Sequence, residues 1–357
     1  MSAVDGNTMH NFEKLSHLQK YNFLIFSIVL VVMISFALVQ SQNVFAQVKP
    51  TLKEFPVENG SLAHDVAPVP AKDGPVWFTA EDTGDLGKLD PTTGKVHLIP
   101  LGKKAHPHGV ILGPDGVPWI TDGGLNAIVR VDPKTEEVKV FPLPENITKK
   151  YKYSLLNTPT VDKNGMVWFT GRAGFYGKLN PETGIFDIYL APRGRGPYGI
   201  TTSPDGSVYF NSWNGNYTGR IDPQTGKLTI LEPPTKGPMN RRVWSDSQGH
   251  VWVSEWAAGN LASYDPTTNK WKEWRVPGDS PIPYGVYVDE KDIVWLTNWA
   301  VENGTQTLLR FDPTKEKFEA FPLPSDHSDI HQLNGRPGEV WAAEAGIDKI
   351  LLIRTGD

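Results

Sequence analysis

PHGVILGPDGVPWITDGGLNAIVRVDPKTEEVKVFPLP, residues 107–144, is the stretch that decides the fold. It holds four short apolar runs separated by a Pro-Asp-Gly turn, a glycine-containing loop and an Asp-Pro-x-Thr turn. In the last of these turns the Asp side chain bonds to backbone groups ahead of it, and Pro fixes the next φ angle. Four runs joined by such short connections predict a four-stranded antiparallel meander.

The same unit recurs along the chain, and an aromatic residue marks its second run each time. Successive marks are 41 to 49 residues apart, which is the length of one β-propeller blade. We expect these aromatic side chains to lie in the core. The seven positions are Trp77, Trp119, Trp168, Tyr209, Trp252, Trp295 and Trp341.

The two ends of the repeat are complementary. The last unit stops at KILLIRTGD, residues 349–357, without a fourth strand, whereas TLKEFPV at 51–57 resembles the fourth strands of other units. We therefore expect 51–57 to complete the seventh blade, which removes the open edges of the sheet array. The predicted fold is all-β, a seven-bladed β-propeller of four-stranded antiparallel blades closed by its N-terminal strand.

The segment before the repeats predicts export. Residues 23–39 form an apolar run without a charge, and Val44-Phe45-Ala46 is a suitable site for signal peptidase. We interpret 1–46 as a signal peptide or an N-terminal membrane anchor and 47–357 as the propeller domain. The expected location is extracellular or at the cell surface, with membrane contact only through 23–39 if this segment is uncleaved.

Composition excludes several kinds of protein. The net charge of −5 does not favour a nucleic-acid partner. With no cysteine, the chain has no disulfide, no thiolate metal site and no thiol nucleophile. We expect a small-molecule substrate and a monomeric protein.

Propeller geometry predicts where a site lies. The first strand of each blade lines the axis, so residues that enter strand one and leave strand two meet at one rim of the axial channel. His108 and Asp122 straddle the Pro-Asp-Gly turn in this way, as do Tyr198 and Ser212, and we expect each pair to be cross-strand neighbours. The entry series is His64, His108, Asn157, Tyr198, Arg241, Tyr284 and His331. The exit series is Ala80, Asp122, Gly171, Ser212, Glu255, Asn298 and Glu344.

These rim residues vary while the scaffold repeats, which favours a functional site at the rim. The entry histidines His64, His108 and His331 belong to blades that become adjacent when the ring closes, and we take them as catalytic candidates. The acids expected beside them, as candidate metal ligands, are Asp122, Glu344 and Asp329. Imidazoles with carboxylates suit general acid–base chemistry or a divalent cation.

A second pattern lies four residues after the aromatic mark. Blades four, five and six carry Trp213, Trp256 and Trp299 there, which predicts an aromatic wall over the channel mouth. Such a wall suits a ligand with apolar or planar groups. Further candidate substrate-binding residues, from the entry series, are Tyr198, Tyr284 and Arg241.

The repeat also resembles a known family. Units such as PHGVILGPDGVPWITD and PYGITTSPDGSVYFNS, followed by IVRVDP or GRIDPQTG, are similar to the blades of the virginiamycin B lyases, which are seven-bladed streptogramin lyases. The resemblance covers nearly all of residues 51–353. It implies an enzyme that opens a cyclic depsipeptide ester by elimination, with Mg²⁺ and with histidines at the Pro-His-Gly position.

The family pattern implies particular residues. It places one acid two residues before such a histidine, a second acid 14 residues after it, and another histidine in the preceding blade. In blade two, His108 has Asp122 and His64, but His106 replaces the first acid. In blade seven, His331 has Asp329 two residues before it and Glu344 13 residues after it, but the preceding blade carries Tyr284 instead of a histidine.

The leading hypothesis is therefore a lyase with Mg²⁺ on the axial face. Ca²⁺ is the alternative cation. A second hypothesis is a binding propeller without catalysis, whose three indoles hold an extracellular ligand or protein. A third is a Ca²⁺-dependent lactonase, although that type has six blades and this sequence has seven marks.

Overall fold

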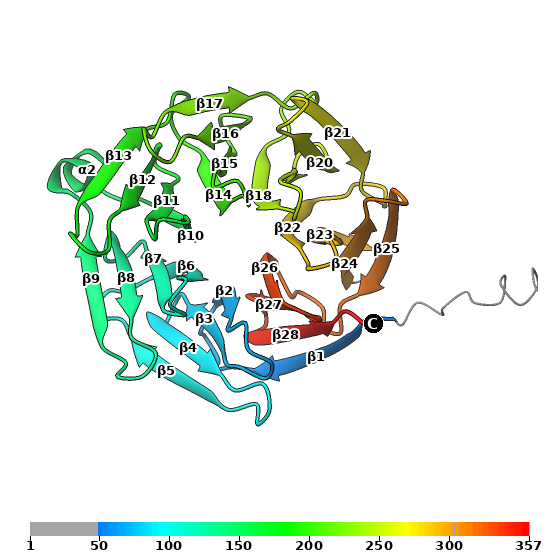
Figure 1. Ribbon diagram of the computed structural model, residues 1–357. Helices are drawn as coiled ribbons and strands as arrows, with labels where there is room; N and C mark the ends of the chain where they lie inside the picture. The colour runs from blue at the N-terminus through cyan, green and yellow to red at the C-terminus, as the bar shows by residue number, and fades with distance from the viewer. Residues whose placement is uncertain (1–48, 303–304, 357) are drawn as a thin grey trace, which may run out of the picture. The chain divides into compact units, whose positions relative to one another are not determined.

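Seven four-stranded antiparallel sheets surround one axis, which confirms the predicted propeller (Figure 1). The computed structural model describes residues 49–302 and 305–356, and Pro50–Gly356 form one structural unit. The predicted signal peptide or anchor at 1–46 lies outside the described residues. Among the described residues, no helix has both the length and the apolar composition needed to span a membrane.

The strands follow the predicted meander in every blade. The innermost strands are β2 (Ala63–Pro68), β6 (Pro107–Leu112), β10 (Leu156–Val161), β14 (Pro197–Thr202), β18 (Asn240–Ser245), β22 (Pro283–Val288) and β26 (Ile330–Arg336). The second strands are β3 (Val76–Ala80), β7 (Pro118–Asp122), β11 (Val167–Gly171), β15 (Val208–Ser212), β19 (Val251–Glu255), β23 (Val294–Glu302) and β27 (Glu339–Glu344). The third strands are β4 (Asp85–Leu89), β8 (Ala127–Val131), β12 (Phe175–Leu179), β16 (Tyr217–Ile221), β20 (Asn260–Asp265), β24 (Thr305–Asp312) and β28 (Lys349–Arg354).

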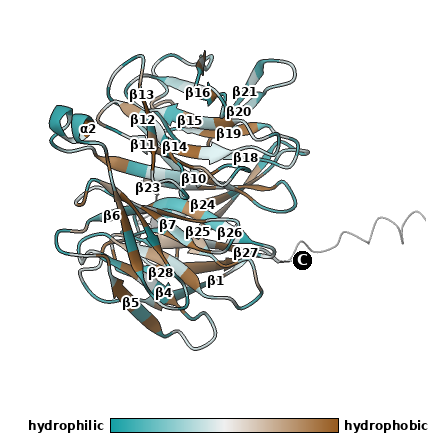
Figure 2. Ribbon diagram, turned by 60° about the vertical axis from the view of Figure 1, so that its left-hand side comes forward, coloured by the Kyte–Doolittle hydropathy of each residue, from teal (hydrophilic) through white to brown (hydrophobic). Residues whose placement is uncertain are grey.

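The outermost strands lie at the periphery of Figure 1. They are β5 (Val96–Pro100), β9 (Val138–Pro142), β13 (Phe186–Leu190), β17 (Leu228–Leu231), β21 (Lys270–Arg275), β25 (Lys317–Pro322) and β1 (Thr51–Pro56). The short helix α2 (Glu145–Lys150) follows β9 and shows teal, hydrophilic residues at the outer edge of the propeller (Figure 2).

The repeated aromatic residues lie between sheets, as predicted. Trp168, Trp295 and Trp341 have no exposed surface. The indole nitrogen of Trp168 donates a hydrogen bond to Asp162 at 2.8 Å, and Trp295 donates to Asp289 in the same way. Each of these acids lies in the turn between the first two strands, so a single contact secures both the turn and the core aromatic residue.

The N-terminal strand closes the ring. β1 pairs antiparallel with β28 from Thr51↔Arg354 to Pro56↔Lys349. Phe55 is buried and stacks on Trp341, with ring centroids 5.9 Å apart. Beyond the strand, the carboxylate of Asp348 accepts the N–H groups of Gly60 and Leu62 at 2.7 and 2.8 Å. The sheet that closes the propeller therefore combines the two ends of the chain.

A hydroxyl two residues after the core aromatic residue joins neighbouring blades. Thr79 Oγ1 accepts the N–H of Asp65 at 3.0 Å in its own blade and donates to the carbonyl oxygen of His108 at 2.9 Å in the next. Ser254 joins Arg242 to Tyr284 in the same way, at 3.1 and 2.6 Å. The accepted N–H belongs to a β-bulge, which occurs between the first two strands of all seven blades.

The closing blade uses different atoms at this position. It carries Ala343 in place of the hydroxyl, and Gln332 of β26 pairs with the peptide group of Val66 instead. The Gln332 side-chain oxygen accepts the Val66 N–H at 3.0 Å, and its nitrogen donates to the Val66 oxygen at 3.3 Å. The contact between the last and first blades is therefore made by an amide on the innermost strand.

Replacing Phe55 by alanine tests closure. Because Phe55 is buried against Trp341, Phe55→Ala should lower the free energy of unfolding in urea by about 3 kcal/mol or more. Val140→Ala is the control, since Val140 is an exposed apolar residue on the outermost strand of blade two. It should change stability by less than about 0.5 kcal/mol. Equal small effects for both variants would contradict closure by β1.

Candidate functional site

Three histidines from three adjacent blades meet at one end of the axial channel. The ring of His64 lies 4.0 Å from that of His108 and 4.4 Å from that of His331, measured between centroids. His64 and His108 are buried, and His331 is partly exposed. The convergence expected from the repeat is thus present in the structure.

His64 and His108 each have one ring nitrogen without a protein partner among the described residues, and this nitrogen accepts a proton in His64 and carries one in His108. His64 Nδ1 lies 3.0 Å from the carboxylate of Asp65, which only accepts while ionised, so Nδ1 carries the proton and Nε2 is free to accept one. The side-chain nitrogen of Asn157 donates to His108 Nε2 at 3.0 Å. The proton of neutral His108 is therefore on Nδ1, which has no hydrogen-bond partner in the described structure. One acceptor and one donor consequently lie side by side.

A buried ion pair contacts two of the three histidines. Arg242 donates to both oxygens of Asp65, at 2.8 and 3.3 Å, and to Thr158 Oγ1 at 2.8 Å. Its Nε donates to the carbonyl oxygen of His331 at 2.9 Å. Burial opposes ionisation of Asp65, but Arg242 and His64 outweigh it and lower the pKa of the carboxyl. Asp65 therefore stays ionised and keeps His64 in the stated tautomer.

The surroundings keep two of the rings neutral. Burial lowers the pKa of His108 well below its usual value, and His64 and the nearby arginines lower it further. Burial likewise lowers the pKa of His331, with His64 and Arg242 adding to the effect. A neutral imidazole accepts or relays a proton without first losing one.

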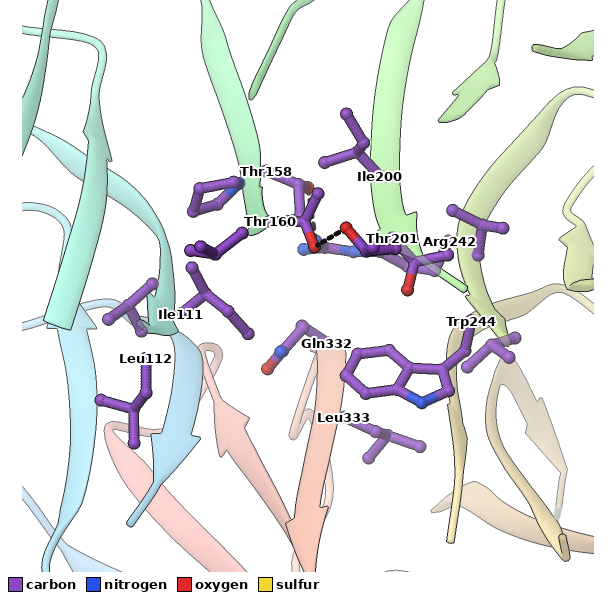
Figure 3. A pocket seen from close by; sticks show the side chains of 17 residues that line it. Ile111, Leu112, Thr158, Thr160, Ile200, Thr201, Arg242, Trp244, Gln332 and Leu333 are labelled. Atoms are coloured by element: carbon purple, nitrogen blue, oxygen red, sulfur yellow. Dashed lines mark hydrogen bonds between the residues drawn. The ribbon is translucent and has the colours of Figure 1, made fainter. Parts of the chain in front are cut away.

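Arg242 of the ion pair also lines a cavity of about 240 Å³ between the innermost strands (Figure 3). Arg242 and Thr158 line it together with Gln332 and Trp244. Thr160 and Thr202 bond to each other across its wall at 3.2 Å. The ion pair therefore lies between this cavity and the histidines.

The predicted partners of the entry residues are wrong by one position. Asp122 pairs with Pro107 and Ser212 pairs with Pro197, rather than with His108 and Tyr198, because the bulge begins directly after the paired residue. The bulge turns the entry side chain toward the axis. The exit side chain instead faces the loop between blades.

Asp122 illustrates the consequence of this register. Its carboxylate accepts the N–H of His106 at 3.0 and 3.1 Å and that of Leu125 at 2.8 Å. Asn298 of the exit series accepts the N–H of Ile282 at 2.7 Å in the corresponding place. In the structure, Asp122 therefore caps the loop that leads into β6.

The other predicted acids also lie away from the ion pair. Asp329 accepts the side-chain N–H of Gln306 at 2.9 Å. Glu344 has no exposed surface, and burial raises its pKa to about 7. Burial raises the pKa of Glu255, its equivalent in blade five, to about 8. These two exit acids are protonated at mildly acidic pH.

The residues do not offer Mg²⁺ or Ca²⁺ the predicted acid cluster. In 49–302 and 305–356, the histidine and acid side chains that bring three ligand atoms within 4.8 Å of one another are His64, Asp65 and His108. Both oxygens of Asp65 already bind Arg242, whose positive charge opposes a cation. These ions also prefer more oxygen ligands than this group supplies. The described residues therefore do not fit either cation.

Aromatic residues and arginines form the rest of the rim. Trp213 and Trp256 both contact Arg241, whose guanidinium carbon is 3.9 and 4.9 Å from their ring centroids. Trp299 instead stacks on Tyr284 at 4.6 Å and contacts His331 at 4.7 Å. The three indoles thus contact other residues of the rim, two of them through Arg241, and their role as a wall for a ligand stays a prediction.

Two tyrosines connect the wall to the ion pair. Tyr198 and Tyr284 are buried, and their hydroxyl groups are hydrogen-bonded to each other. Although burial acts in the opposite direction, Arg242 and Arg241 lower the pKa of Tyr198. Arg241 also donates to the Tyr284 hydroxyl at 3.2 Å. The expected substrate-binding residues thus lie together at the rim.

Sequence reasoning missed the ion pair. Asp65 and Arg242 each follow an entry residue directly, at a position where blades two, four and six carry glycine. Gly109 illustrates why, since a Cβ atom there would lie 2.5 Å from the Asn157 oxygen of the next blade. The position after the entry residue holds one acid and one arginine among the seven blades. A comparison of the blades at this position would have revealed the pair from the sequence.

The exit acids predict how stability depends on pH. The folded chain holds protons on Glu255 and Glu344 that the unfolded chain releases above its ordinary glutamate pKa. Stability in urea should therefore fall between about pH 5 and pH 9. Glu344→Gln should reduce the fall, whereas the exposed Glu182→Gln should not. An unchanged slope for Glu344→Gln would show that this carboxyl is not protonated in the fold.

Comparisons with known proteins agree with this architecture. A streptogramin B lyase structure has a TM-score of 0.76 and 24% identity, covering 86% of this chain and 98% of that one. Virginiamycin B lyase from Staphylococcus aureus has the same TM-score and 21% identity, with 86% and 99% covered. The same values hold for its catalytically inactive histidine-to-alanine variant with quinupristin. At these identities the likeness shows the fold.

Family membership comes from the sequence match. No curated protein sequence matches the chain. The model of the virginiamycin B lyase family matches residues 36–298 and 151–357, which together include every blade and all three axial histidines. This chain, with its seven blades and its imidazoles at the axial rim, therefore belongs to the virginiamycin B lyase family.

Proposed function

We propose that the chain is a lyase that eliminates the carbon–oxygen bond of an ester in a cyclic depsipeptide or a related compound. The observation that carries the proposal is the His64–His108 pair, in which a proton acceptor and a proton donor lie side by side at the rim. Family membership supports the same reaction class. Export is proposed together with this activity, on the basis of the apolar run of residues 23–39.

His64 is the proposed base. Its free Nε2 takes the proton from the carbon next to a substrate carbonyl, and the electron pair of that C–H bond forms a carbon–carbon double bond. The bond between the adjacent carbon and the ester oxygen breaks, and the oxygen leaves as part of a carboxylate. Asp65 stabilises the resulting imidazolium because it is already bonded to Nδ1.

His108 and His331 have supporting roles in the proposal. The Nδ1 proton of His108 is available to a substrate carbonyl oxygen that gains negative charge as the proton leaves. His331 stacks on His64 and is the most exposed of the three rings, so it contacts both the base and the substrate. No step uses a cation, because the described residues do not fit one.

The reaction class is tested by incubating residues 49–357 with quinupristin, the ligand present with the inactive relative. Mass spectrometry distinguishes the two ways of opening the ester. Elimination leaves the mass unchanged and adds an alkene, whereas hydrolysis adds one water. We expect an opened product of unchanged mass, formed equally well in a chelator. A product heavier by one water would assign a hydrolase, the class to which a lactonase belongs.

Variants test the role of His64. His64→Ala should lower kcat by about 100-fold or more, because a positioned general base contributes that much. His97→Ala is the control, since His97 lies exposed on β5 beside Glu136. Full activity of His64→Ala would contradict the assignment. Absence of any opened product, with retained binding, would favour the binding propeller.

A further inference from the structure

Two arginines at the rim form no ion pair with an acid in the part of the chain that the structure describes. Arg241 is 8% exposed, and among the described residues its guanidinium bonds only to the Tyr284 hydroxyl. Its Nε atom is buried without a hydrogen-bond partner. Arg172 is half-buried, its guanidinium forms no hydrogen bond or ion pair within the described part of the chain, and its Nε is buried and unpartnered as well.

The two guanidinium groups flank one ring. The carbon of the Arg172 guanidinium is 5.9 Å from the centroid of Tyr198, and that of Arg241 is 5.1 Å from it. The indole nitrogens of Trp213 and Trp256, which lie against Arg241, are also buried without partners. Four unpartnered donors therefore belong to neighbouring residues of blades three, four and five.

The acids of the rim have other partners. Asp65 is bound to Arg242, and Glu81 lies 3.1 Å from His106. Neither forms an ion pair with Arg172 or Arg241 in the described residues. Burial raises the pKa of Glu81, and Arg172 is near enough to oppose that rise without contacting the carboxylate. A buried guanidinium without a counter-charge is costly, and an anion that binds there recovers the cost. The planar guanidinium matches a carboxylate in shape and charge.

We propose that the substrate of this site carries a carboxylate, held by Arg172 and Arg241, on the carbon that loses its proton. This inference rests on the elimination chemistry of the proposed lyase function. Within that function it favours the related compounds over the cyclic depsipeptide itself, and it names them as anionic compounds with an oxygen leaving group on the next carbon. The arginines neutralise the carboxylate, so the charge that develops on its carbon during proton removal is stabilised.

The reaction balances without another reactant. His64 takes the proton, the C–H electron pair becomes the double bond, and the oxygen on the neighbouring carbon leaves with its bonding pair. An ester oxygen leaves as a carboxylate and needs no proton. The product is an unsaturated carboxylate, which the same two arginines bind.

Benzoate is a probe that separates binding from reaction, because it is a planar carboxylate with no proton to lose on the adjacent carbon. Benzamide is its neutral counterpart. Tryptophan fluorescence is the readout, since Trp213 and Trp256 contact Arg241. We expect benzoate to change the fluorescence saturably at concentrations up to about 10 mM, and benzamide to have no such effect.

Variants locate the binding. Arg241→Gln and Arg172→Gln should each weaken benzoate binding about tenfold or more. Arg130→Gln is the matched control, because Arg130 on β8 is half-buried and pairs with Asp115 at 3.9 Å away from the rim. It should leave binding unchanged. Arg241 is the more buried of the two residues, so its variant is the one at risk of not folding. In that case Arg172→Gln alone tests whether the arginines bind benzoate.

The outcomes separate this inference from the proposed function. Equal binding of benzoate and benzamide, or no benzoate binding at about 10 mM, would overturn the carboxylate proposal even if a neutral depsipeptide is eliminated. Benzoate binding that both arginine variants weaken supports it, even if no ester is eliminated. The last comparison uses a compound with a free carboxylate and an acyloxy group on the next carbon, together with its methyl ester. Faster elimination of the free carboxylate would support both the lyase function and the carboxylate inference.

Discussion

The hydrogen bonds of one repeated hydroxyl hold the blades in register with one another. Thr79, Thr121, Ser254 and Thr297 each accept an N–H from the bulge of their own blade and donate to a carbonyl of the next blade. Because these bonds are buried, they are satisfied by a single arrangement of neighbouring sheets. The bulge they stabilise turns the entry side chains to the axis. Every contact among the axial histidines depends on that geometry.

The residue after each entry residue decides what fills the axis. Glycine at this place in blades two, four and six allows the inner strands to approach closely, as Gly109 does against Asn157. The remaining four blades carry Asp65, Thr158, Arg242 and Gln332, whose side chains bond across the channel and to neighbouring blades. The alternation produces a polar layer directly beneath the imidazoles. Asp65 therefore fixes the tautomer of His64, and Arg242 keeps Asp65 ionised.

Most of the fold was predictable because turn chemistry and aromatic spacing are local signals that recur seven times. Closure by 51–57 was also predictable, since that segment resembles the outer strands. The meeting of His64, His108 and His331 followed from the same repeat. The roles of the acids did not, because one bulged residue per blade changes which side chain faces the axis, and no local pattern marks that bulge. Asp122 consequently caps a loop. The Asp65–Arg242 pair joins blades one and five, and its residues are 177 positions apart.

The central claim is that neutral His108 and His331 meet His64 beside a buried ion pair, and ¹⁵N NMR of the histidine rings tests it most directly. Titration of residues 49–357, with assignments from single histidine variants, reports the charge and tautomer of each ring. The account predicts that His108 and His331 stay neutral well below the usual histidine pKa, and that neutral His108 carries its proton on Nδ1. Protonation of either ring at or above the usual histidine pKa would contradict it.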